Sequence, residues 1–384
     1  MRFDYNRMKS TGSSQSVSSQ HQDDFCDYLK AALQNALKLT TGDYGDYAVT
    51  TSSQGVTVVP YYPVDRPIDY SFYTDIYKVL VVAAYPYYTV LKPSGLQLVP
   101  IKSDLYQRRR GLFFPWLKGV PKRRVLSPDK YAEDIARAVS LKSMQIPLMD
   151  NFSIDLEHTT HIAISGQSGS GKSYLVRYFL PYLLAMGDLT LIDPKADDLL
   201  LWAKSDQCTA IRRNTGRTPN VEYPDLLGKS GTFLSEVSET LSREVHIMYQ
   251  REDTYSKTGK RPFGHRFIVI DELLALTQGG QKVDVNNFFA NLSSLALLGR
   301  SAKMHLILIS QRFSSDAMPT SIRDQLQAVF QLGPITKTST QFLFPDFDSE
   351  GVIPPRGKGT GICQIQGDVI PYPRPFLSPT YTDD

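Results

Sequence analysis

The residues that could do chemistry begin with a glycine-rich segment, residues 166–173, which fits the pattern G-x-x-x-x-G-K-[ST]. Glycines in such a loop let backbone N–H groups face phosphate oxygens, and the following helix N-terminus adds a favourable dipole. Lys172 would supply charge to the β- and γ-phosphates, and Ser173 would bind Mg²⁺. The predicted nucleotide-binding residues are Gly166, Gln167, Ser168, Gly169, Ser170, Gly171, Lys172, Ser173 and Tyr174.

A second element is the acidic pair Asp271–Glu272, which closes the apolar run 267–270. At the carboxyl end of a parallel strand, Asp271 would hold Mg²⁺ through water. Glu272 would then point at the γ-phosphate and polarise the attacking water, which distinguishes hydrolysing motors from many kinases. The alternative is an ordinary strand end with an exposed acidic pair, which is common for these two residues by themselves.

The third element is Gln311, which follows the run 305–310. A polar residue that closes a core strand next to the strand of the glycine-rich loop can contact the γ-phosphate or the lytic water. Gln311 is therefore the candidate γ-phosphate sensor. The alternative is a glutamine that merely begins a loop.

The elements that must position these residues are short apolar runs alternating with helical segments. Fully apolar short strands separated by helices indicate a parallel sheet covered on both faces. The expected fold class is α/β, with a largely parallel sheet and a smaller N-terminal α+β domain. The runs are 161–164, 189–192, 267–270, 305–309 and 329–332.

The order of these motifs resembles the FtsK/SpoIIIE branch of the FtsK–HerA ATPases. The likeness covers about residues 145–372 and includes I-D-P-K from Ile192, I-D-E-L from Ile270, the segment 299–307 and S-Q-R from Ser310. The resemblance implies a RecA-like P-loop core, hexameric rings, ATP and Mg²⁺ between subunits, and double-stranded DNA as partner. It also aligns Arg300 with the arginine finger that reaches a neighbour's γ-phosphate; the alternative is a surface arginine.

Two departures bear on biological role. A membrane-spanning N-terminus and the C-terminal winged-helix module of chromosomal translocases are not recognised, which favours a mobile-element protein. FtsK-like coupling proteins of Gram-positive elements are most similar, so conjugative transfer is expected, with a relaxase or membrane channel protein as partner. The alternatives are a DNA-packaging ATPase of a virus or plasmid, a nucleotide-dependent DNA-binding switch with slow hydrolysis, and a small-molecule kinase.

Composition is consistent with a globular, cytoplasmic protein, and any membrane contact is expected to come through a partner or a surface attachment. The 384 residues suit two domains, and the formal net charge of +3 says little about partners. The three cysteines are widely spaced, so neither a disulfide framework nor a zinc site is expected. No secretory signal and no spanning helix is expected.

The remaining segments are predicted as follows. Residues 1–22 are expected to be disordered, and residues 23–101 to form a small α+β domain, with a helix over 23–39 and strands at 55–59 and 77–82. The basic stretch within 102–144 is either a linker whose aromatics dock on the core or a nucleic-acid contact. Residues 145–372 form the ATPase domain and 373–384 a tail. The segment 255–261 is a candidate DNA-facing loop or a plain solvated loop.

Overall fold

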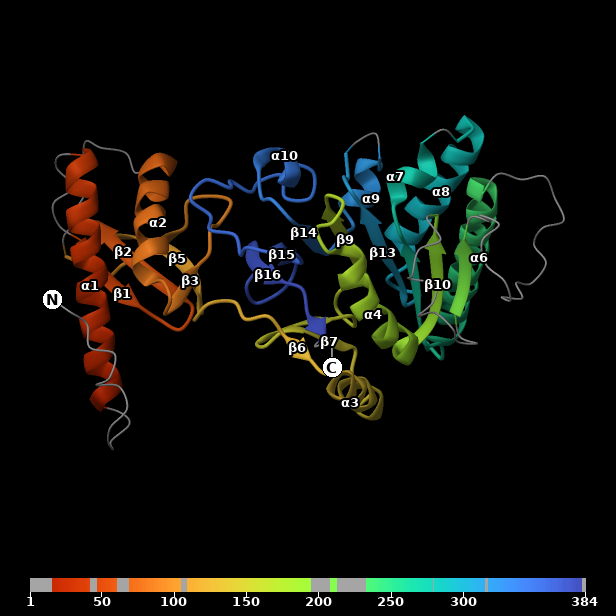
Figure 1. The fold of residues 1–384 in the computed structure, drawn as a ribbon, viewed down its shortest axis with the longest axis horizontal. Coiled ribbons are helices and arrows are strands. Elements are labelled where there is room, and N and C mark those ends of the chain that lie inside the picture. The colour runs from red at the N-terminus through yellow and green to blue at the C-terminus, as the bar shows by residue number, and fades with distance from the viewer. Residues whose placement is uncertain are drawn as a thin grey trace. The chain divides into compact units, whose positions relative to one another are not determined.

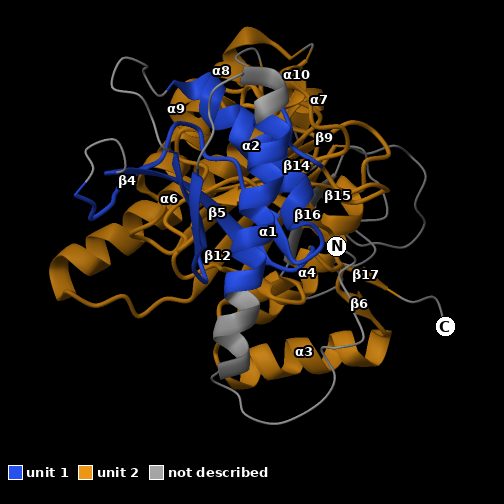
Figure 2. Cartoon of the chain, turned by 90° about the vertical axis from the view of Figure 1, so that its left-hand side faces the viewer, with its two compact units in different colours: residues 1–120, 350–353 blue, residues 121–349, 354–384 orange. Residues whose placement is uncertain are grey.

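The computed structural model describes residues 16–41, 47–60, 69–104, 109–194, 208–212, 233–278, 280–314 and 317–381. The chain divides into two compact units (Figure 2). Unit 1 comprises residues 1–120 and 350–353, and unit 2 comprises residues 121–349 and 354–384. The residues with candidate chemistry all belong to unit 2.

Unit 1 is built on an antiparallel sheet. Its strand order is β1 (Tyr47–Thr51), β2 (Gly55–Pro60), β5 (Arg110–Lys118) and β3 (Tyr88–Val90), and β4 (Leu98–Pro100) also pairs with β5. The helix α1 (Ser16–Thr41) packs its buried Leu29, Leu33 and Leu37 into the core of this unit. The helix begins inside residues 1–22, the segment expected to be disordered. Serine and glutamine are tolerated at the start of a helix whose later turns pack a buried apolar face into the core.

The expected strand over 77–82 is wrong, because this run belongs to the helix α2 (Tyr70–Ala84). Asp69 caps the helix by accepting a hydrogen bond from the Phe72 backbone N–H at 2.8 Å. Its buried residues recur at helical spacing, and β-branched residues are tolerated when such a face is buried. They are Phe72, Tyr73, Thr74, Ile76, Tyr77, Leu80, Ala83 and Ala84.

The basic stretch is not a linker over its whole length, because residues 110–118 form the strand β5 at the middle of the sheet. Phe114 and Trp116 are buried, so neither aromatic ring is available to stack on nucleic acid. Trp116 stacks on Tyr88 with ring centroids 3.9 Å apart and donates its indole N–H to the Ser52 carbonyl. The alternation of apolar residues along the strand explains the burial.

Unit 2 contains an eight-stranded sheet with the order β11-β10-β12-β13-β9-β14-β15-β16. All five predicted apolar runs are strands of this sheet and are mutually parallel, which confirms the expected α/β class. The strands are β9 (His161–Gly166), β10 (Gly187–Asp193), β11 (Cys208–Arg212), β12 (His265–Ile270), β13 (Met304–Ser310), β14 (Ala328–Leu332), β15 (Thr360–Ile365) and β16 (Arg374–Leu377).

Helices cover both faces of this sheet (Figure 1). Residues of α4 (Lys172–Met186) join one hydrophobic core, against which α3 (Pro128–Ser140) also packs. Residues of α6 (Phe233–Thr258) and α8 (Lys282–Leu298) join a second core on the other face. The remaining elements are α7 (Leu273–Thr277), α9 (Thr320–Arg323), α10 (Lys337–Thr340), β6 (Val125–Leu126), β7 (Gln145–Met149), β8 (Phe152–Asp155) and β17 (Thr380–Tyr381).

The C-terminal segment is also not a tail. Residues 374–377 form β16, which pairs antiparallel with β15 at the edge of the large sheet, and β17 pairs with β6. Phe376 is buried against Phe330, with ring centroids 4.9 Å apart. Proline is tolerated here because β16 is an edge strand. Likewise α3, β6 and β7 place residues 121–149 in this unit rather than in a linker.

Candidate nucleotide site

The glycine-rich loop joins the end of β9 to the start of α4, as the pattern predicts. Lys172 is only 8% exposed, and its Nζ donates hydrogen bonds to the carbonyls of Gly166 at 2.5 Å and Gln167 at 3.1 Å. By contrast, Gln167, Ser168, Gly169, Ser173 and Tyr174 are exposed. The loop therefore holds the buried Lys172 ammonium through its own carbonyls, while residues beside that ammonium remain accessible to solvent. This arrangement leaves room for an anionic phosphate at the loop.

The acidic pair lies at the carboxyl end of β12, and both residues are buried. Asp271 is 4% exposed and Glu272 is 2% exposed. The alternative of an exposed acidic pair is therefore wrong. The backbone N–H of Asp271 donates to the carbonyl of Ile192, which extends the parallel pairing with β10. Glu272 has a φ of +54°, an uncommon conformation for a non-glycine residue that is typical of functional sites.

Gln311 follows β13, which lies between β9 and β12 in the sheet. The predicted neighbourhood of the sensor strand and the loop strand is thus confirmed by the pairing of β13 with β9. Gln311 contacts Glu272 through two hydrogen bonds, both 3.3 Å long. The structure therefore gathers Lys172, Asp271, Glu272 and Gln311 at one edge of the sheet, where the parallel strands end.

The residues at this edge fit a magnesium ion bound together with a nucleotide. No group of three or more metal-ligating side chains occurs in the part of the chain that the structure describes. Magnesium does not need such a group, because it is commonly held by one or two carboxylates together with substrate phosphates. Asp271 and the Ser173 hydroxyl are the predicted ligands, and bound Mg²⁺ would neutralise charge on the phosphates.

Asp193 is a further candidate site residue, to which the sequence motifs assigned no role. It ends β10, the strand beside β12, and is fully buried. The signal was present, since an aspartate closes the apolar run 189–192 just as Asp271 closes 267–270. We therefore expect a second carboxylate at this edge, near Asp271.

Arg300 is not brought to this site. It is exposed and lies just before β13 begins at Met304, whereas Gln311 follows the end of the same strand. A strand of 7 residues spans roughly 23 Å at 3.3 Å per residue, so Arg300 lies about that far from Gln311 along the sheet. Arg300 therefore lies at the amino edge of the sheet, away from the glycine-rich loop of its own chain.

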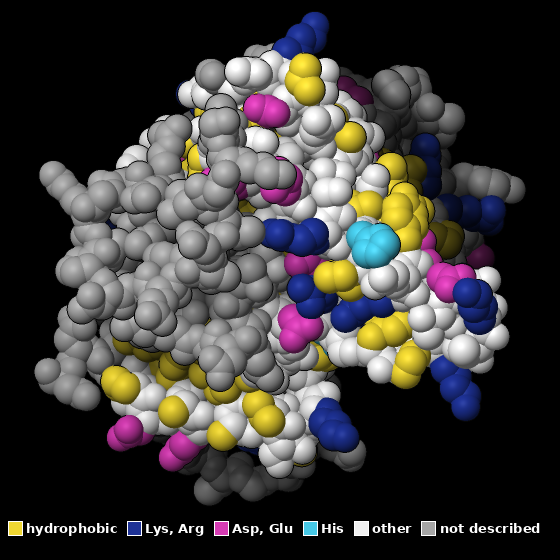
Figure 3. Space-filling model, turned by 90° about the vertical axis from the view of Figure 1, so that its right-hand side faces the viewer, with side chains coloured by type: hydrophobic (Ala, Val, Ile, Leu, Met, Phe, Trp, Pro, Cys, Tyr) yellow, Lys and Arg dark blue, Asp and Glu magenta, His cyan; other side chains and the backbone are white. Residues whose placement is uncertain are grey.

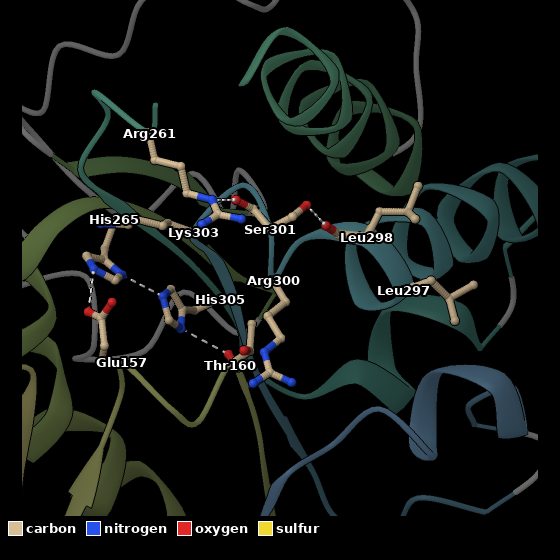
Figure 4. Close-up of a pocket in the computed structure, with 10 residues that line it drawn as sticks. All are labelled: Glu157, Thr160, Arg261, His265, Leu297, Leu298, Arg300, Ser301, Lys303 and His305. Atoms are coloured by element: carbon tan, nitrogen blue, oxygen red, sulfur yellow. Dashed lines mark hydrogen bonds and ion pairs between the residues drawn. The ribbon is translucent and has the colours of Figure 1, made fainter. Parts of the chain in front are cut away.

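Arg300 lines a pocket of about 460 Å³ (Figure 4). The lining combines the basic side chains of Arg261, Arg300 and Lys303 with exposed leucines, Leu297 at 53% and Leu298 at 41%. Within the described residues, one carboxylate, that of Glu157, lines this pocket. Its surroundings are thus basic and partly apolar.

One wall of the pocket is a chain of histidine contacts, which the dashed lines of Figure 4 follow. His305 Nδ1 lies 3.1 Å from the Thr160 carbonyl, and His305 Nε2 lies 2.8 Å from His265 Nδ1. Because the carbonyl accepts, His305 donates from Nδ1 and accepts at Nε2. Burial lowers the pKa of His305 to about 3 and also lowers the pKa of His265, whose Nε2 lies 3.2 Å from Glu157.

The segment 255–261 ends α6 and leads towards the same pocket. Arg261 lies over the Tyr255 ring, 4.0 Å from its centroid, and donates to the Ser301 carbonyl at 3.0 Å. Lys257 pairs with Asp253 at 2.6 Å, while Lys260 is exposed. These contacts anchor part of the segment, so it is not a plain solvated loop.

The face of the molecule in Figure 3 shows basic side chains interspersed with acidic and apolar ones.

The fold and the site together define a P-loop nucleoside triphosphatase with a RecA-like core. Its glycine-rich loop, its acidic pair and the candidate sensor Gln311 follow the carboxyl ends of β9, β12 and β13. None of the described helices has the length and apolar character needed to cross a membrane.

Comparison with known proteins agrees with this class, although no family model matches the chain. The FtsK domain-containing protein YdcQ of Bacillus subtilis is 24% identical over 270 residues, which cover 70% of this chain and 52% of that protein. The DNA translocase FtsK of Helicobacter pylori strain J99 is 26% identical over 222 residues, covering 54% of this chain and 24% of that protein.

Among solved structures, the pCW3 conjugation coupling protein TcpA, in its monomer form with ATPgS, has a TM-score of 0.55 at 13% identity. That match covers 93% of this chain and 95% of the other, and it shows a shared fold. The chain is thus a homologue of FtsK domain proteins, and the resemblance that its motifs indicate is confirmed. The chain spans about half the length of YdcQ and a quarter of that FtsK.

Proposed function

We propose that this protein is a DNA-stimulated ATPase that assembles into a ring, with six subunits as the expected number, and moves double-stranded DNA. FtsK relatives named DNA translocases support the DNA substrate. The coupling protein TcpA supports transfer of conjugative or other mobile-element DNA as the process. A relaxase or a membrane channel protein would then be the partner that receives or delivers the DNA.

The observation that carries this proposal is the separation of Arg300 from the other site residues. Lys172, Glu272 and Gln311 lie at the carboxyl edge of the sheet, and Arg300 lies at the amino edge. Strands of a sheet are too rigid for this distance to close within one chain. If Arg300 stabilises transition-state charge on the γ-phosphate, it must do so on a neighbouring subunit.

In the proposed cycle, Lys172 would contact the β- and γ-phosphates, and Ser173 and Asp271 would hold Mg²⁺. The buried carboxylate of Glu272 accepts a proton from the attacking water as the water oxygen bonds to the γ-phosphorus and the bond from that phosphorus to the β-phosphate oxygen breaks, which releases ADP and phosphate. Gln311, which is hydrogen-bonded to Glu272, would couple the presence of the γ-phosphate to the position of the Glu272 carboxylate. The exposed Lys260 and its neighbours in the segment 255–261 are proposed to contact the DNA backbone, so binding should weaken with salt.

Mixing two inactive variants tests the shared site. Glu272→Gln lacks the water-activating group but keeps Arg300, and Arg300→Ala lacks the finger but keeps Glu272. Each variant alone should hydrolyse ATP at least about 100-fold more slowly than the wild type. In a mixture, some interfaces combine an intact Glu272 with an intact Arg300, so DNA-stimulated hydrolysis should partly return.

A mixture that stays as inactive as its components would contradict the shared site, provided that the wild-type protein is active under the same conditions. Hydrolysis that is independent of duplex DNA would favour the nucleotide switch or the kinase instead. Images of the protein with duplex DNA and a slowly hydrolysed ATP analogue would separate a ring around DNA from a monomeric enzyme.

A further inference from the structure

The glycine-rich loop rests directly on a distant backbone segment, residues 357–361. The N–H of Gly359 donates a hydrogen bond to the carbonyl of Ser170 at 2.9 Å. A Cβ added to Gly171 would lie 2.9 Å from both the Cα and the N of Gly359. The two backbones therefore touch without a side chain between them, and a shift of Gly359 must be transmitted to the loop.

Arg123 holds this segment in place from the opposite side. Its guanidinium donates from Nη2 to the Lys358 carbonyl and from Nη1 to the Ser378 carbonyl, both at 2.7 Å. The N–H of Ser378 in turn donates to the Gly359 carbonyl at 2.7 Å. The planar, forked guanidinium can join two carbonyls in this way, whereas a lysine ammonium does not match the geometry.

The C-terminal strand also reaches the first turn of α4. The backbone N–H of Tyr381 donates to the Tyr174 hydroxyl at 3.1 Å, and the two rings lie 5.7 Å apart. Burial lowers the pKa of Arg123, and the neighbouring Tyr174 opposes that shift. The segment 357–361 thus contacts the later half of the loop, at Ser170 and Gly171, and the C-terminal strand contacts the first turn of α4 at Tyr174.

We propose that Arg123 is a positioning residue for the nucleotide site, which acts through Lys358 and Gly359 to hold the glycine-rich loop in its phosphate-binding conformation. Arg123 itself donates to the backbone carbonyl of Lys358 in this segment and to that of Ser378, which lies between β16 and β17. The proposal rests on one part of the proposed function, namely that the loop binds a nucleoside triphosphate. The proposal gives Arg123 a structural role. Arg123 belongs to the basic stretch, and the sequence leaves the role of that stretch open.

The test compares Arg123→Met with Lys122→Met, which removes the same charge from the adjacent, exposed residue. The readout is the Kd for a fluorescent ATP analogue with Mg²⁺, measured without DNA. Arg123→Met should raise this Kd about tenfold, which corresponds to about 1.4 kcal/mol. Arg123→Lys should lie between Arg123→Met and the wild type, and Lys122→Met should bind like the wild type.

Hydrogen exchange, followed by mass spectrometry on the peptide that contains Gly359, reports the contact itself. Exchange there should be faster in Arg123→Met than in the wild type, at equal melting temperature. If Arg123→Met does not fold, Arg123→Lys carries the same comparison. Wild-type Kd in both Arg123 variants would overturn the proposal, as would an equal loss in Lys122→Met.

The two proposals fail differently. Loss of DNA movement with normal nucleotide binding refutes the translocase and leaves the role of Arg123 standing. Normal nucleotide binding by Arg123→Met refutes the positioning role and leaves the translocase standing.

Discussion

Gln311 donates two hydrogen bonds to the carboxylate of Glu272, one from its backbone N–H to Oε1 and one from its side-chain Nε2 to Oε2. Both are 3.3 Å long, so each oxygen of the candidate water-activating group is engaged by the same residue. Glu272 is buried and lies in a left-handed backbone conformation. The position of Glu272 thus depends on the end of β13 as well as on β12. The two predicted site residues are in direct hydrogen-bond contact.

The first prediction concerns this contact. Gln311→Ala should lower the rate of ATP hydrolysis roughly 10- to 100-fold, because Glu272 loses a side-chain donor that orients it. The KM for ATP should change much less, since Gln311 is not expected to hold the ground-state nucleotide. Steady-state kinetics measure both values. Gln341→Ala, at an exposed position, is the matched control; an unchanged rate in Gln311→Ala would contradict the assigned role.

The second prediction concerns magnesium. Asp271→Asn should raise the Mg²⁺ concentration needed for half-maximal hydrolysis about tenfold, because a carboxylate that holds the ion through water is replaced by a neutral amide. Asp193→Asn should show the same direction if this buried neighbour also faces the ion. Titration of Mg²⁺ at fixed ATP measures the effect. Asp150→Asn, on an exposed turn, should match the wild type.

The third prediction concerns pH. Burial lowers the pKa of His161 to about 4 and that of His305 to about 3, from an ordinary value of 6.5. Below pH 6.5 the unfolded chain therefore binds protons that the folded chain does not, and the free energy of unfolding falls. At pH 5 the loss should be about 2 kcal/mol per histidine relative to pH 7.5.

Urea denaturation at the two pH values checks this expectation. His305→Gln keeps a donor for the Thr160 carbonyl but cannot titrate, so its loss of stability between pH 7.5 and pH 5 should be smaller than that of the wild type. An identical pH dependence in the variant and the wild type would show that His305 is not the group responsible.

The fourth prediction concerns the C-terminal strand. Phe376→Ala should lower the free energy of unfolding by about 3–5 kcal/mol, because it leaves a cavity against Phe330 in the core of unit 2. Val369→Ala, at a residue that is 86% exposed, should have little effect. Chemical denaturation measures both. A Phe376→Ala variant as stable as Val369→Ala would mean that this segment is a dispensable tail.

Local pattern predicted which residues lie together in the candidate nucleotide site, because these residues follow strands that are apolar along their whole length. Such runs mark parallel strands covered on both faces, and the carboxyl ends of these strands meet at one edge. The glycine-rich loop, Asp271–Glu272 and Gln311 were each found from a few adjacent residues. Asp193 shows the same signal and was missed only because no role was attached to it.

Local sequence pattern gave the wrong secondary structure in segments whose conformation is set by tertiary packing. The run 77–82 is as β-branched as a strand, but a buried face and the Asp69 cap make it helical. The basic stretch suggested a linker or a nucleic-acid contact, yet the core of unit 1 needs its Phe114 and Trp116 in a central strand. The C-terminal segment suggested a tail until its pairing with β15 was seen.

The amino-acid sequence by itself determined the chemistry of the loop and acidic pair, because backbone conformation and charge at those positions depend on residue type within a few neighbours. Only the tertiary structure decided that Gln311 hydrogen-bonds to Glu272, that Arg300 lies at the other edge of the sheet, and that Arg123 bonds to the carbonyl of Lys358, next to the Gly359 that contacts the loop. Those relationships join residues far apart in the chain, and strand order and packing, which no local pattern records, set the distances between them.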